Sequence, residues 1–563
     1  MRSDSLISQT NLLKEGIFKC LLRRLPPKSN SRYLKDIINI LLEALLDGEI
    51  EVSLSNKDYS YTSNVEGWPD SHLKELKESG WLNKHNSPVI IKDDKILFNR
   101  WNIEIKKIFS ELKKRNDSLK TINKISGEVN LSKFNRQQKV AINAIQENKV
   151  VFISGGPGTG KTSTIIGIIE RMVNNREDLK IGLAAPTGKA SRRLKESIQK
   201  SINKKEFSHL RNLGKIPCKT IHSWLEVRNY AFSKNSKNQL NLDLLIVDEM
   251  SMVDISLMNS ILSSLPFSSQ LLLVGDYNQL PPIGTGDVWK KIIELDKNLF
   301  NYKNFINLDE VFRNNGELAY QSKFLCDNNL KTFWGNILNR SEEGNLKIEI
   351  SNDKNTPEKI INRLLKQKSL MNKLAFNIEQ LLLVNYRQEQ VNNSNLELAI
   401  KNAFHYLDNL MVLCVQRSGV WGINDINLKL IGEKYKEGIS QLASGTPVIC
   451  SKNQHELGLA NGDIGLIVGE GKEKRLLFRI IDEENTIKNH FVHPSRVKNI
   501  EPAFAITIHK AQGSEANEVF ILWPEKISDC NRKQSRNEME YSKRLLYTGI
   551  TRAKNNATIL TRR

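Results

Sequence analysis

Short, fully apolar runs recur along the chain from Val150 onward, and each is followed by a polar or glycine-rich turn. Such runs are typical of strands buried on both faces of a parallel sheet, and helical patterns lie between them. The sequence therefore predicts an α/β fold whose ligands bind at the carboxyl ends of the strands. The predicted strands are VVFIS from Val150, IGLAA from Ile181, LLIVDE from Leu244, LLLVGD from Leu271 and LLLV from Leu381.

Two other patterns flank or interrupt these runs. Ser31 to Leu46 and Trp101 to Leu112 carry apolar residues at helical spacing, which predicts an accessory helical domain over residues 1–125. Between about 430 and 500, the segments GTPVIC, DIGLIVGEG, RLLFRIIDEE and NHFVHP read as short strands separated by turn residues. They predict a small antiparallel barrel inserted in the second α/β unit, after which the helix–strand alternation resumes at Ala503.

Length and composition agree with a multidomain globular chain. At roughly 150 residues per domain, 563 residues correspond to about three or four domains. With 39% hydrophobic and 26% charged residues, collagen-like and wholly disordered chains are excluded. No apolar run approaches the length of a membrane span, and the start lacks the apolar core of a signal peptide, so we expect a cytoplasmic protein. The six cysteines and nine histidines form no metal-binding motif.

The strongest chemical signal is a phosphate-binding loop between the strand VVFIS and the helical pattern STIIGIIERMV. Its glycines let backbone N–H groups surround phosphate oxygens at a helix N-terminus. We expect Lys161 to reach the β- and γ-phosphates of ATP, and Thr162 to hold Mg²⁺ through its hydroxyl. The loop is Gly155, Gly156, Pro157, Gly158, Thr159, Gly160, Lys161 and Thr162.

Polar residues that follow two further strands complete a predicted ATP-hydrolysing site. Asp248 ends the strand LLIV, where a carboxylate can anchor the Mg²⁺ shell, and Glu249 beside it is the candidate general base. Gln279 follows the strand LLLV within GDYNQLPP, where its amide could bond water or the γ-phosphate. A turn-stabilising role is the alternative for Gln279.

In this order, the motifs resemble those of superfamily 1 helicases, and the segments GGPGTGKT, APTGKAS, NGDIGLIV and IHKAQGSE resemble RecD-type helicases, the alpha subunits of exodeoxyribonuclease V. The resemblance spans about residues 134 to 560. It implies that Gln138 reads adenine and that Arg313 and Arg552 reach the γ-phosphate from the second lobe. It also implies DNA contacts by seven residues: Thr187, Lys189, Thr220, His222, Thr507, His509 and Lys510.

Charge is consistent with a nucleic-acid partner. The formal net charge is +20, and residues 187–219 carry ten basic residues against two acidic ones, directly after the first DNA-contact motif. A basic groove with nearby aromatic residues such as Trp224, Phe207 and His222 is a common arrangement for single-strand binding. A solvated helix face and a generally basic composition are the alternatives.

The resemblance implies a specific architecture. It consists of two RecA-like P-loop NTPase lobes, with an N-terminal helical domain and a small SH3-like β-barrel insert. The expected boundaries are 1–125 for a subunit-contact domain, 126–305 for the first lobe, 306–430 with 501–563 for the second lobe, and 431–500 for the insert. Leu381 to Val391 fits the family poorly, which leaves Arg387 without a role.

The implied function is ATP-driven unwinding of DNA in the 5′→3′ direction, on single strands at duplex ends, within a heterotrimer with RecB-like and RecC-like subunits. By the same resemblance, any nuclease site lies on a partner. The alternatives are a stand-alone or mobile-element helicase of the same superfamily, and a nucleotide-gated regulatory subunit that binds DNA ends without translocating. Neither polarity nor DNA over RNA preference follows from the residues themselves.

Overall fold

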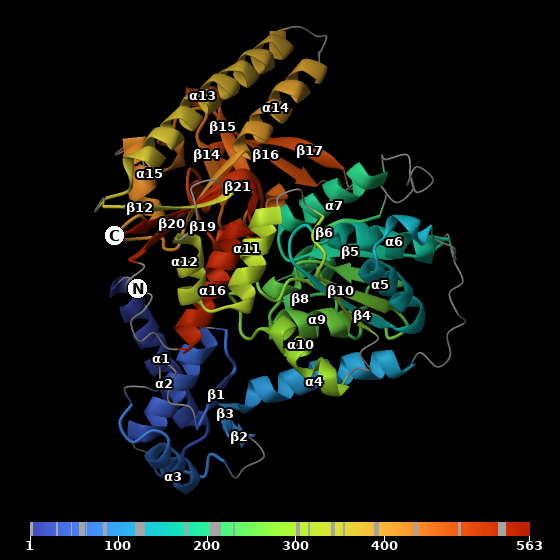
Figure 1. Cartoon of the computed structure of the whole chain (residues 1–563), viewed down its shortest axis with the longest axis vertical. Helices are drawn as coiled ribbons and strands as arrows, with labels where there is room; N and C mark the ends of the chain where they lie inside the picture. The colour runs from blue at the N-terminus through green and yellow to red at the C-terminus, as the bar shows by residue number, and fades with distance from the viewer. Residues whose placement is uncertain are drawn as a thin grey trace.

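The computed structural model describes residues 4–29, 32–46, 48–55, 62, 65–82, 87–118, 130–174, 178–202, 216–228, 231–299, 304–312, 316–338, 344–352, 355–387, 393–432, 437–481, 486–526 and 536–563. Two α/β units lie side by side, with the N-terminal region below them and a helical hairpin projecting at the opposite end (Figure 1). We call the two units the first and second lobes.

The first lobe is built on a six-stranded sheet in which every described pairing is parallel. Alternate residues of its strands enter different cores: Val150 and Phe152 pack on one face, and Val151 and Ile153 on the other. This burial on both faces is the reason that the strands are continuously apolar. In order the strands are β11 (Phe305–Leu308), β4 (Val150–Gly155), β10 (Gln270–Gly275), β9 (Leu244–Val247), β5 (Ile181–Ala185) and β6 (Cys218–Thr220).

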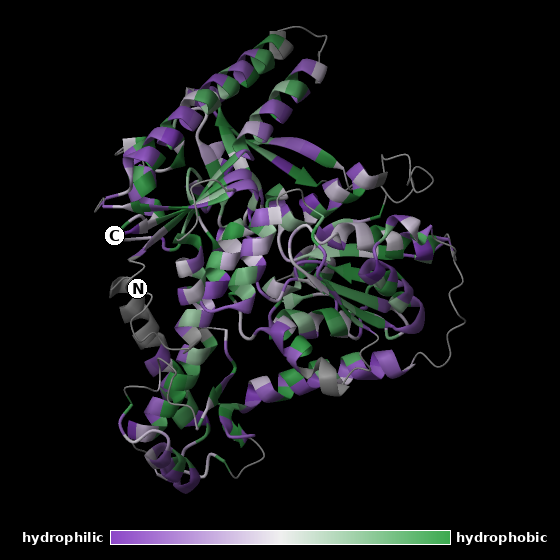
Figure 2. Cartoon of the chain, viewed as in Figure 1, coloured by the Kyte–Doolittle hydropathy of each residue, from purple (hydrophilic) through white to green (hydrophobic). Residues whose placement is uncertain are grey.

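Helices cover both faces of this sheet (Figure 2 shows the hydrophobic strands enclosed between them). One face packs against α5 (Arg136–Glu147), α6 (Lys161–Val173) and α7 (Gly188–Ile202). The opposite face packs against α8 (Ile221–Leu225), α9 (Ile255–Ser264), α10 (Val288–Leu299) and also α4 (Asn99–Asp117). Four predicted strands are therefore present in the first lobe, and its sheet continues through β11, just past the expected boundary at residue 305.

The second lobe contains a five-stranded parallel sheet. Its two cores likewise take alternate residues, such as Leu413 on one face and Val412 on the other. The strands in order are β12 (Leu346–Ser351), β21 (Ala553–Arg562), β20 (Ala516–Lys526), β13 (Leu410–Cys414) and β19 (Ile506–Thr507). The covering helices include α11 (Gly316–Asp327), α12 (Leu330–Leu338), α15 (Ile423–Ile431) and α16 (Arg536–Ile550).

The strand predicted at Leu381 is wrong, because LLLV lies inside the helix α13 (Glu358–Arg387). Leu381 and Leu382 follow Ile378 at helical spacing, and all three pack in one core with α14 (Asn393–Leu407). Val384, by contrast, is exposed. A four-residue apolar run has no periodicity of its own to distinguish a strand from part of a helix.

The inserted segment forms a five-stranded antiparallel sheet, in the order β17 (Ile487–Val492), β16 (Arg475–Ile481), β15 (Ile464–Val468), β14 (Pro447–Cys450) and β18 (Ile500–Pro502). All four segments predicted as strands in this region contain one. The order starts at β17 and ends at β18, so the described strands form an open sheet where a barrel was expected. The α13–α14 hairpin packs on this sheet through Leu466, Val468 and Leu477.

The N-terminal region contains the helices α1 (Asp4–Arg24), α2 (Arg32–Leu46), α3 (Asp70–Glu78) and α4. It also contains three strands that the sequence analysis missed, in the antiparallel order β1 (Glu51–Ser53), β3 (Lys95–Phe98), β2 (Val89–Lys92). They are three or four residues long, too short for a clear alternation of apolar and polar positions.

Helix α4 anchors this region to the first lobe through one buried arginine. The Arg115 guanidinium donates to the carbonyl oxygens of Pro266 (2.7 Å), Leu262 (3.1 Å) and Leu265 (2.7 Å), and it pairs with Glu111 (3.0 Å). These carbonyls lie at and just after the C-terminal end of α9, where a cation is favoured. Burial lowers the pKa of Arg115, and Glu111 opposes that effect.

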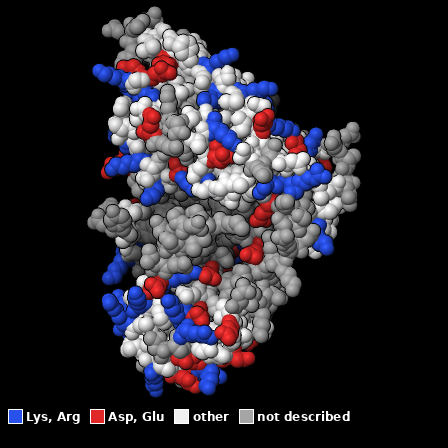
Figure 3. All heavy atoms as spheres, turned by 90° about the vertical axis from the view of Figure 1, so that its left-hand side faces the viewer, with Lys and Arg blue, Asp and Glu red and all other residues white. Residues whose placement is uncertain are grey.

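No described helix is both long enough and apolar enough to cross a membrane. On the face shown in Figure 3, Lys and Arg side chains are interspersed with Asp and Glu side chains. The surplus of positive charge is therefore not gathered into one patch on the described part of that face.

We predict that Arg115→Met lowers the free energy of unfolding by about 2–4 kcal/mol, because it leaves buried carbonyl oxygens and Glu111 without their partner. Chemical denaturation followed by circular dichroism measures the change. Lys106→Met, at an exposed position of the same helix, is the control and is expected to change stability by less than about 0.5 kcal/mol. Equal effects of both variants would contradict the anchoring role.

Candidate nucleotide-binding site

The phosphate-binding loop connects β4 directly to α6, as the sequence predicts. Gly158 and Gly160 both adopt φ of +81°, a conformation that strongly favours glycine. A Cβ atom at Gly160 would also collide with the side-chain nitrogen of Gln138. The loop is therefore fixed by backbone conformation and by close packing from behind.

Lys161 begins α6 and folds back over the loop. Its Nζ donates to the carbonyl oxygens of Gly155 (2.6 Å) and Gly156 (3.0 Å), and the Thr159 hydroxyl donates to the Gly156 carbonyl oxygen (2.9 Å). These contacts place the ammonium group above the loop, where a bound phosphate would lie between it and the helix N-terminus. The positive charge thus faces the centre of the predicted site.

The two adjacent carboxylates lie at the end of β9, two strands from the loop in the same sheet. Burial raises the pKa of Asp248 to about 6, and Glu249 adds to this, whereas Lys161 lowers it. Glu249 has φ of +56°, unusual for a residue other than glycine. Strain of this kind is frequent where a side chain is aimed at a functional site.

Asp276 and Gln279 follow β10 and are nearly fully buried. The Gln279 side-chain nitrogen donates to Asp276 Oδ2 (3.3 Å), but its buried side-chain oxygen has no hydrogen-bond partner. Leaving a buried acceptor unpaired is costly, which indicates that a ligand or water completes the site. The ligand-sensing role expected for Gln279 stays a prediction, because the same side chain also donates to Asp276 within the turn.

Both lobes line one cavity of about 330 Å³ at this edge of the first sheet. The first lobe contributes the loop together with the carboxylates and Gln279, and the second contributes Arg552. The Arg552 side chain is buried and donates to the carbonyl oxygens of Thr548 (3.0 Å) and Ser514 (3.3 Å). The structure thus brings together five predicted residues from distant parts of the chain: Lys161, Asp248, Glu249, Gln279 and Arg552.

The lobes are also joined by hydrogen bonds next to this cavity. The Tyr547 hydroxyl donates to Asp276 Oδ2 (2.8 Å), and the Leu280 backbone nitrogen donates to the Thr548 hydroxyl (3.0 Å). Desolvation raises the pKa of both Asp276 and Tyr547, and for Tyr547 the negative charge of Asp276 adds to it. A neutral tyrosine is therefore held as the donor across the lobe boundary.

Two further predicted nucleotide contacts, Arg313 and Gln138, are not among the described residues that line this cavity. Arg313 lies outside the described residues, but its neighbour Phe312 lines the cavity, is half exposed, and its backbone nitrogen donates to the Gly158 carbonyl oxygen (2.9 Å). Sequence reasoning missed Phe312. Gln138 is buried behind the loop, and its side-chain oxygen accepts a hydrogen bond from the Asn135 backbone nitrogen at the start of α5. It is absent from the described lining of this cavity.

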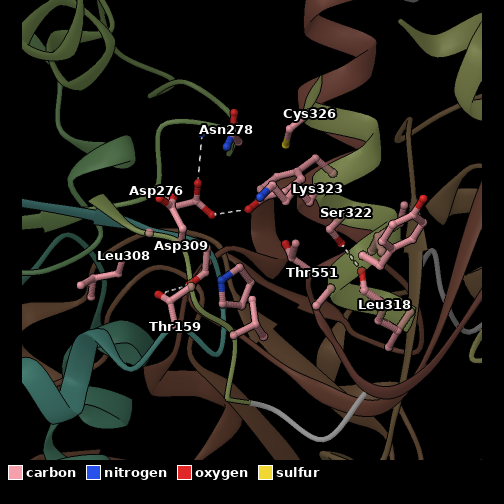
Figure 4. A pocket seen from close by; sticks show the side chains of 18 of the residues that line it. Thr159, Asp276, Asn278, Leu308, Asp309, Leu318, Ser322, Lys323, Cys326 and Thr551 are labelled. Carbon is pink, nitrogen blue, oxygen red and sulfur yellow. Dashed lines mark hydrogen bonds between the residues drawn. The ribbon is translucent and has the colours of Figure 1, made fainter. Parts of the chain in front are cut away.

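A second cavity, of about 380 Å³, lies on the other side of the phosphate-binding loop. Figure 4 shows Lys323 and Cys326, which belong to α11, opposite Asp276 and Thr159. Burial raises the pKa of Cys326, and the charge of Asp276 adds to it, so the thiol is held in its neutral form. Residues of both lobes line this cavity, but neither the predicted base Glu249 nor Arg552 is among the described lining residues.

The four predicted DNA contacts of the first lobe lie at or just after the ends of two neighbouring strands, β5 and β6. The Thr187 and Thr220 hydroxyls accept from the backbone nitrogens of Ala190 (3.2 Å) and Ser223 (3.1 Å), so each caps the start of a helix. Burial lowers the pKa of Lys189 to about 8, and the charge of Asp408 opposes the effect. The fourth residue, His222, has its ring 5.8 Å from that of Phe232.

The three predicted DNA contacts of the second lobe lie at the end of β19, which Thr507 terminates, and just after it. The Thr507 hydroxyl accepts from the backbone nitrogen of Lys510 (3.3 Å), and the Lys510 ammonium group pairs with Glu501 (3.1 Å). His509 is hydrogen-bonded to Tyr541 (2.8 Å), and burial lowers its pKa. The side chains of all three residues have hydrogen-bond or ion-pair partners within the protein. Their DNA contacts stay predictions.

Basic residues that follow the first DNA-contact motif form ion pairs within the protein, which the sequence did not predict. Arg192 pairs with Asp463 (2.6 Å), and Arg193 pairs with Glu515. Arg479 of β16 reaches back to Glu196 (2.9 Å). The described part of the run therefore joins α7 to the second lobe and its insert, while residues 203–215, including Phe207, lie outside the described residues.

Two family models match this chain, one in each lobe. Residues 138–285 match the model of an AAA domain, and residues 502–560 match that of the UvrD-like helicase C-terminal domain. The first match contains the phosphate-binding loop, both strand-end carboxylates and Gln279. The second contains His509 and Arg552.

Two RecD subunits are similar to this chain over most of its length, and a RecD2 helicase is similar to a shorter part of it. The chain is 30% identical over 523 residues to RecBCD enzyme subunit RecD of Buchnera aphidicola subsp. Schizaphis graminum, covering 84% of this chain and 81% of that protein. It is 29% identical over 557 residues to RecBCD enzyme subunit RecD of Buchnera aphidicola subsp. Acyrthosiphon pisum, covering 90% and 88%. The ATP-dependent RecD2 DNA helicase of Deinococcus radiodurans is 35% identical over 150 residues, covering 27% of this chain and 18% of that protein.

The loop geometry predicts that Gly160→Ala abolishes ATP binding, because a methyl group there requires an unfavourable φ and displaces Gln138. Equilibrium titration with a fluorescent ATP analogue measures the affinity. Gly335→Ala, at a helical position with no atom within 4 Å of the added Cβ, is the matched control and should bind normally. Normal binding by Gly160→Ala would show that the loop is not the nucleotide site.

Proposed function

This chain belongs to the family of RecD subunits of the RecBCD enzyme, and we propose that it is an ATP-hydrolysing DNA helicase and the motor subunit of a RecBCD-type exodeoxyribonuclease V. The observation that carries the proposal is the cavity shared by the two lobes, in which Lys161 and Glu249 of one lobe face Arg552 of the other. A motor requires a site that is complete only when the lobes meet. A passive DNA-binding subunit has no need of that arrangement.

The chemistry follows from the groups in the cavity. Lys161 and the loop N–H groups bind the phosphates of ATP, and Glu249 deprotonates the attacking water. Arg552 stabilises the negative charge that develops on the γ-phosphate in the transition state. Gln279, with its unpaired side-chain oxygen, positions the water or reports the γ-phosphate to the lobe boundary at Asp276.

Residues suited to hold Mg²⁺ are present. Mg²⁺ is usually bound by one or two protein oxygen ligands together with substrate phosphates. The Thr162 hydroxyl and the Asp248 carboxylate both line the cavity. The raised pKa of Asp248 reflects buried negative charge beside Glu249, which a divalent cation would compensate. When bound, the cation would neutralise charge on the β- and γ-phosphates.

Hydrolysis is coupled to movement through the lobe boundary. The γ-phosphate attracts Arg552, and in the proposal Arg313, so ATP favours the closed arrangement of the lobes. Loss of the γ-phosphate removes that attraction and lets the lobes separate. DNA held by both lobes, through Thr187 and Lys189 on one and Thr507 on the other, would then be moved stepwise, 5′→3′ by family resemblance.

The partners follow from the family. The named relatives are subunits of the RecBCD enzyme, and we infer that this chain assembles with RecB-like and RecC-like subunits at DNA ends. Residues 1–125 are the proposed subunit-contact domain, although α4 itself belongs to the core of the first lobe. We infer that the antiparallel sheet of β14 to β18 is the insert for which an SH3-like barrel was expected.

We predict that Glu249→Gln retains ATP and single-stranded DNA binding but lowers DNA-stimulated ATP turnover by about 10²–10⁴-fold, the usual contribution of a general base. Lys161→Ala should lose turnover together with ATP affinity. Phosphate production with and without single-stranded DNA or RNA measures both effects and the preferred strand. Glu358→Gln, at the exposed start of α13, is the control, and normal turnover by Glu249→Gln would remove it as the base.

We also predict that the tagged chain, isolated from its native cell, carries a RecB-like and a RecC-like subunit in equal amounts. Mass spectrometry of the purified complex tests the composition, and unwinding of duplexes with 5′ or 3′ tails tests the polarity. Lys161→Ala should assemble equally well, because the ATP cavity is separate from the proposed contact domain. A chain that is recovered alone and unwinds DNA at full rate would favour the stand-alone helicase.

A further inference from the structure

Two adjacent arginines of α7 have different surroundings. Arg192 is fixed in the fold, because it pairs with Asp463 (2.6 Å) and the two side chains are only 11% and 4% exposed. Arg193 pairs with Glu515 of the second lobe, and it is 33% exposed whereas Glu515 is 7% exposed. Arg193 is therefore the more exposed partner of its pair, and Glu515 is the buried one.

Arg193 lies in the nucleotide cavity, although no role there follows from the family motifs. It lines the cavity together with Asp248, Glu249 and Arg552. Burial is the main cause that lowers the pKa of Arg552, and the charge of Arg193 lowers it further. The Arg193 guanidinium is thus within electrostatic reach of the arginine that is expected to meet the γ-phosphate.

A larger cavity, of about 720 Å³, begins on the other side of the Arg193–Glu515 pair. Four residues line both cavities: Arg193, Ser197, Gly513 and Glu515. The ion pair therefore lies where the two cavities adjoin, and the Arg193 side chain borders both.

A bound γ-phosphate competes directly with Glu515 for this guanidinium. Arg193 is partly exposed, so water can solvate its charge when the pair opens. The buried Glu515 would keep a favourable electrostatic interaction with Arg552. Phosphate oxygens accept two parallel hydrogen bonds from arginine, and a terminal phosphate carries more negative charge than one carboxylate. ATP should therefore draw Arg193 away from Glu515, and ADP should not.

We propose that Arg193 reads the γ-phosphate from the first lobe, exchanging its ion pair with Glu515 for contacts with the terminal phosphate of ATP. The inference rests on the proposed function and adds a third phosphate-reading arginine to Arg313 and Arg552. Arg193 lies one helical turn after Lys189 on α7, and that helix begins directly after Thr187. The exchange thus links the nucleotide state to the helix that carries the DNA-contact motif.

The test compares nucleotide affinities of the full chain, with its partner subunits where these co-purify. Arg193→Gln should weaken binding of a non-hydrolysable ATP analogue by at least about tenfold, the loss expected for one charge-assisted hydrogen bond. Its ADP affinity should stay within about twofold, because ADP lacks the phosphate that Arg193 reads. Arg193→Lys should lose less affinity than Arg193→Gln because it keeps the charge, but it should still bind the analogue more weakly than the native chain because lysine makes no bidentate contact.

The matched control is Arg479→Gln, which removes an arginine from the larger cavity and breaks its pair with Glu196, but leaves the nucleotide cavity unchanged. It should bind both nucleotides normally. Glu515→Gln frees Arg193 and should increase the preference for the ATP analogue over ADP. The double variant Arg193→Gln/Glu515→Gln should behave as Arg193→Gln.

Single-stranded DNA affinity gives a second readout. In the native chain it should differ between the ATP-analogue and ADP states, and Arg193→Gln should reduce that difference. Equal weakening of both nucleotides by Arg193→Gln, or no weakening of either, would overturn the role of Arg193. A native chain that binds ATP but shows no DNA-stimulated hydrolysis would instead overturn the proposed motor function, so the two failures are distinguishable.

Discussion

The structure depends on one constraint, the burial of two parallel sheets on both faces. The central strands of the first lobe, β4, β10, β9 and β5, are enclosed by helices on both faces and carry no charged residue, so the charged groups lie at their ends. In the first lobe this restriction places the phosphate loop, the Asp248–Glu249 pair and the Asp276 turn at one edge. The second lobe closes over that edge and supplies Arg552.

Enclosing this edge creates a strongly charged site with little solvent. Burial raises the pKa of Asp248 and of Asp276 and lowers that of Arg552, so each of these charged forms is disfavoured without a partner. Nucleotide phosphates and a divalent cation are suitable partners, since they offset both signs at once. The same electrostatics make the lobe boundary sensitive to a single phosphate group, which is the property a nucleotide-driven motor requires.

The parts of the fold that could be predicted are those with a strong local pattern. The strands around the phosphate loop were found because each is apolar throughout, and the loop because its glycine spacing is specific. The run LLLV at Leu381 was misassigned because four apolar residues fit a strand or a helix equally well. The three N-terminal strands were missed because they are too short. No role was predicted for Phe312 because the resemblance of the motif Val311-Phe312-Arg313 assigns a role only to its arginine.

By itself, the sequence determined which residue types carry the chemistry and at which strand ends they lie, because phosphate binding needs glycines, a lysine and a hydroxyl in a fixed local order. Only the tertiary structure decided which arginine of the basic run reaches the cavity. Arg192 and Arg193 are neighbours in a basic run, yet one is fixed against Asp463 and the other lies beside the nucleotide. Ion pairs between the lobes join segments that are hundreds of residues apart in the chain. A local sequence pattern cannot identify such pairs, because the folding of the whole chain brings the two segments together.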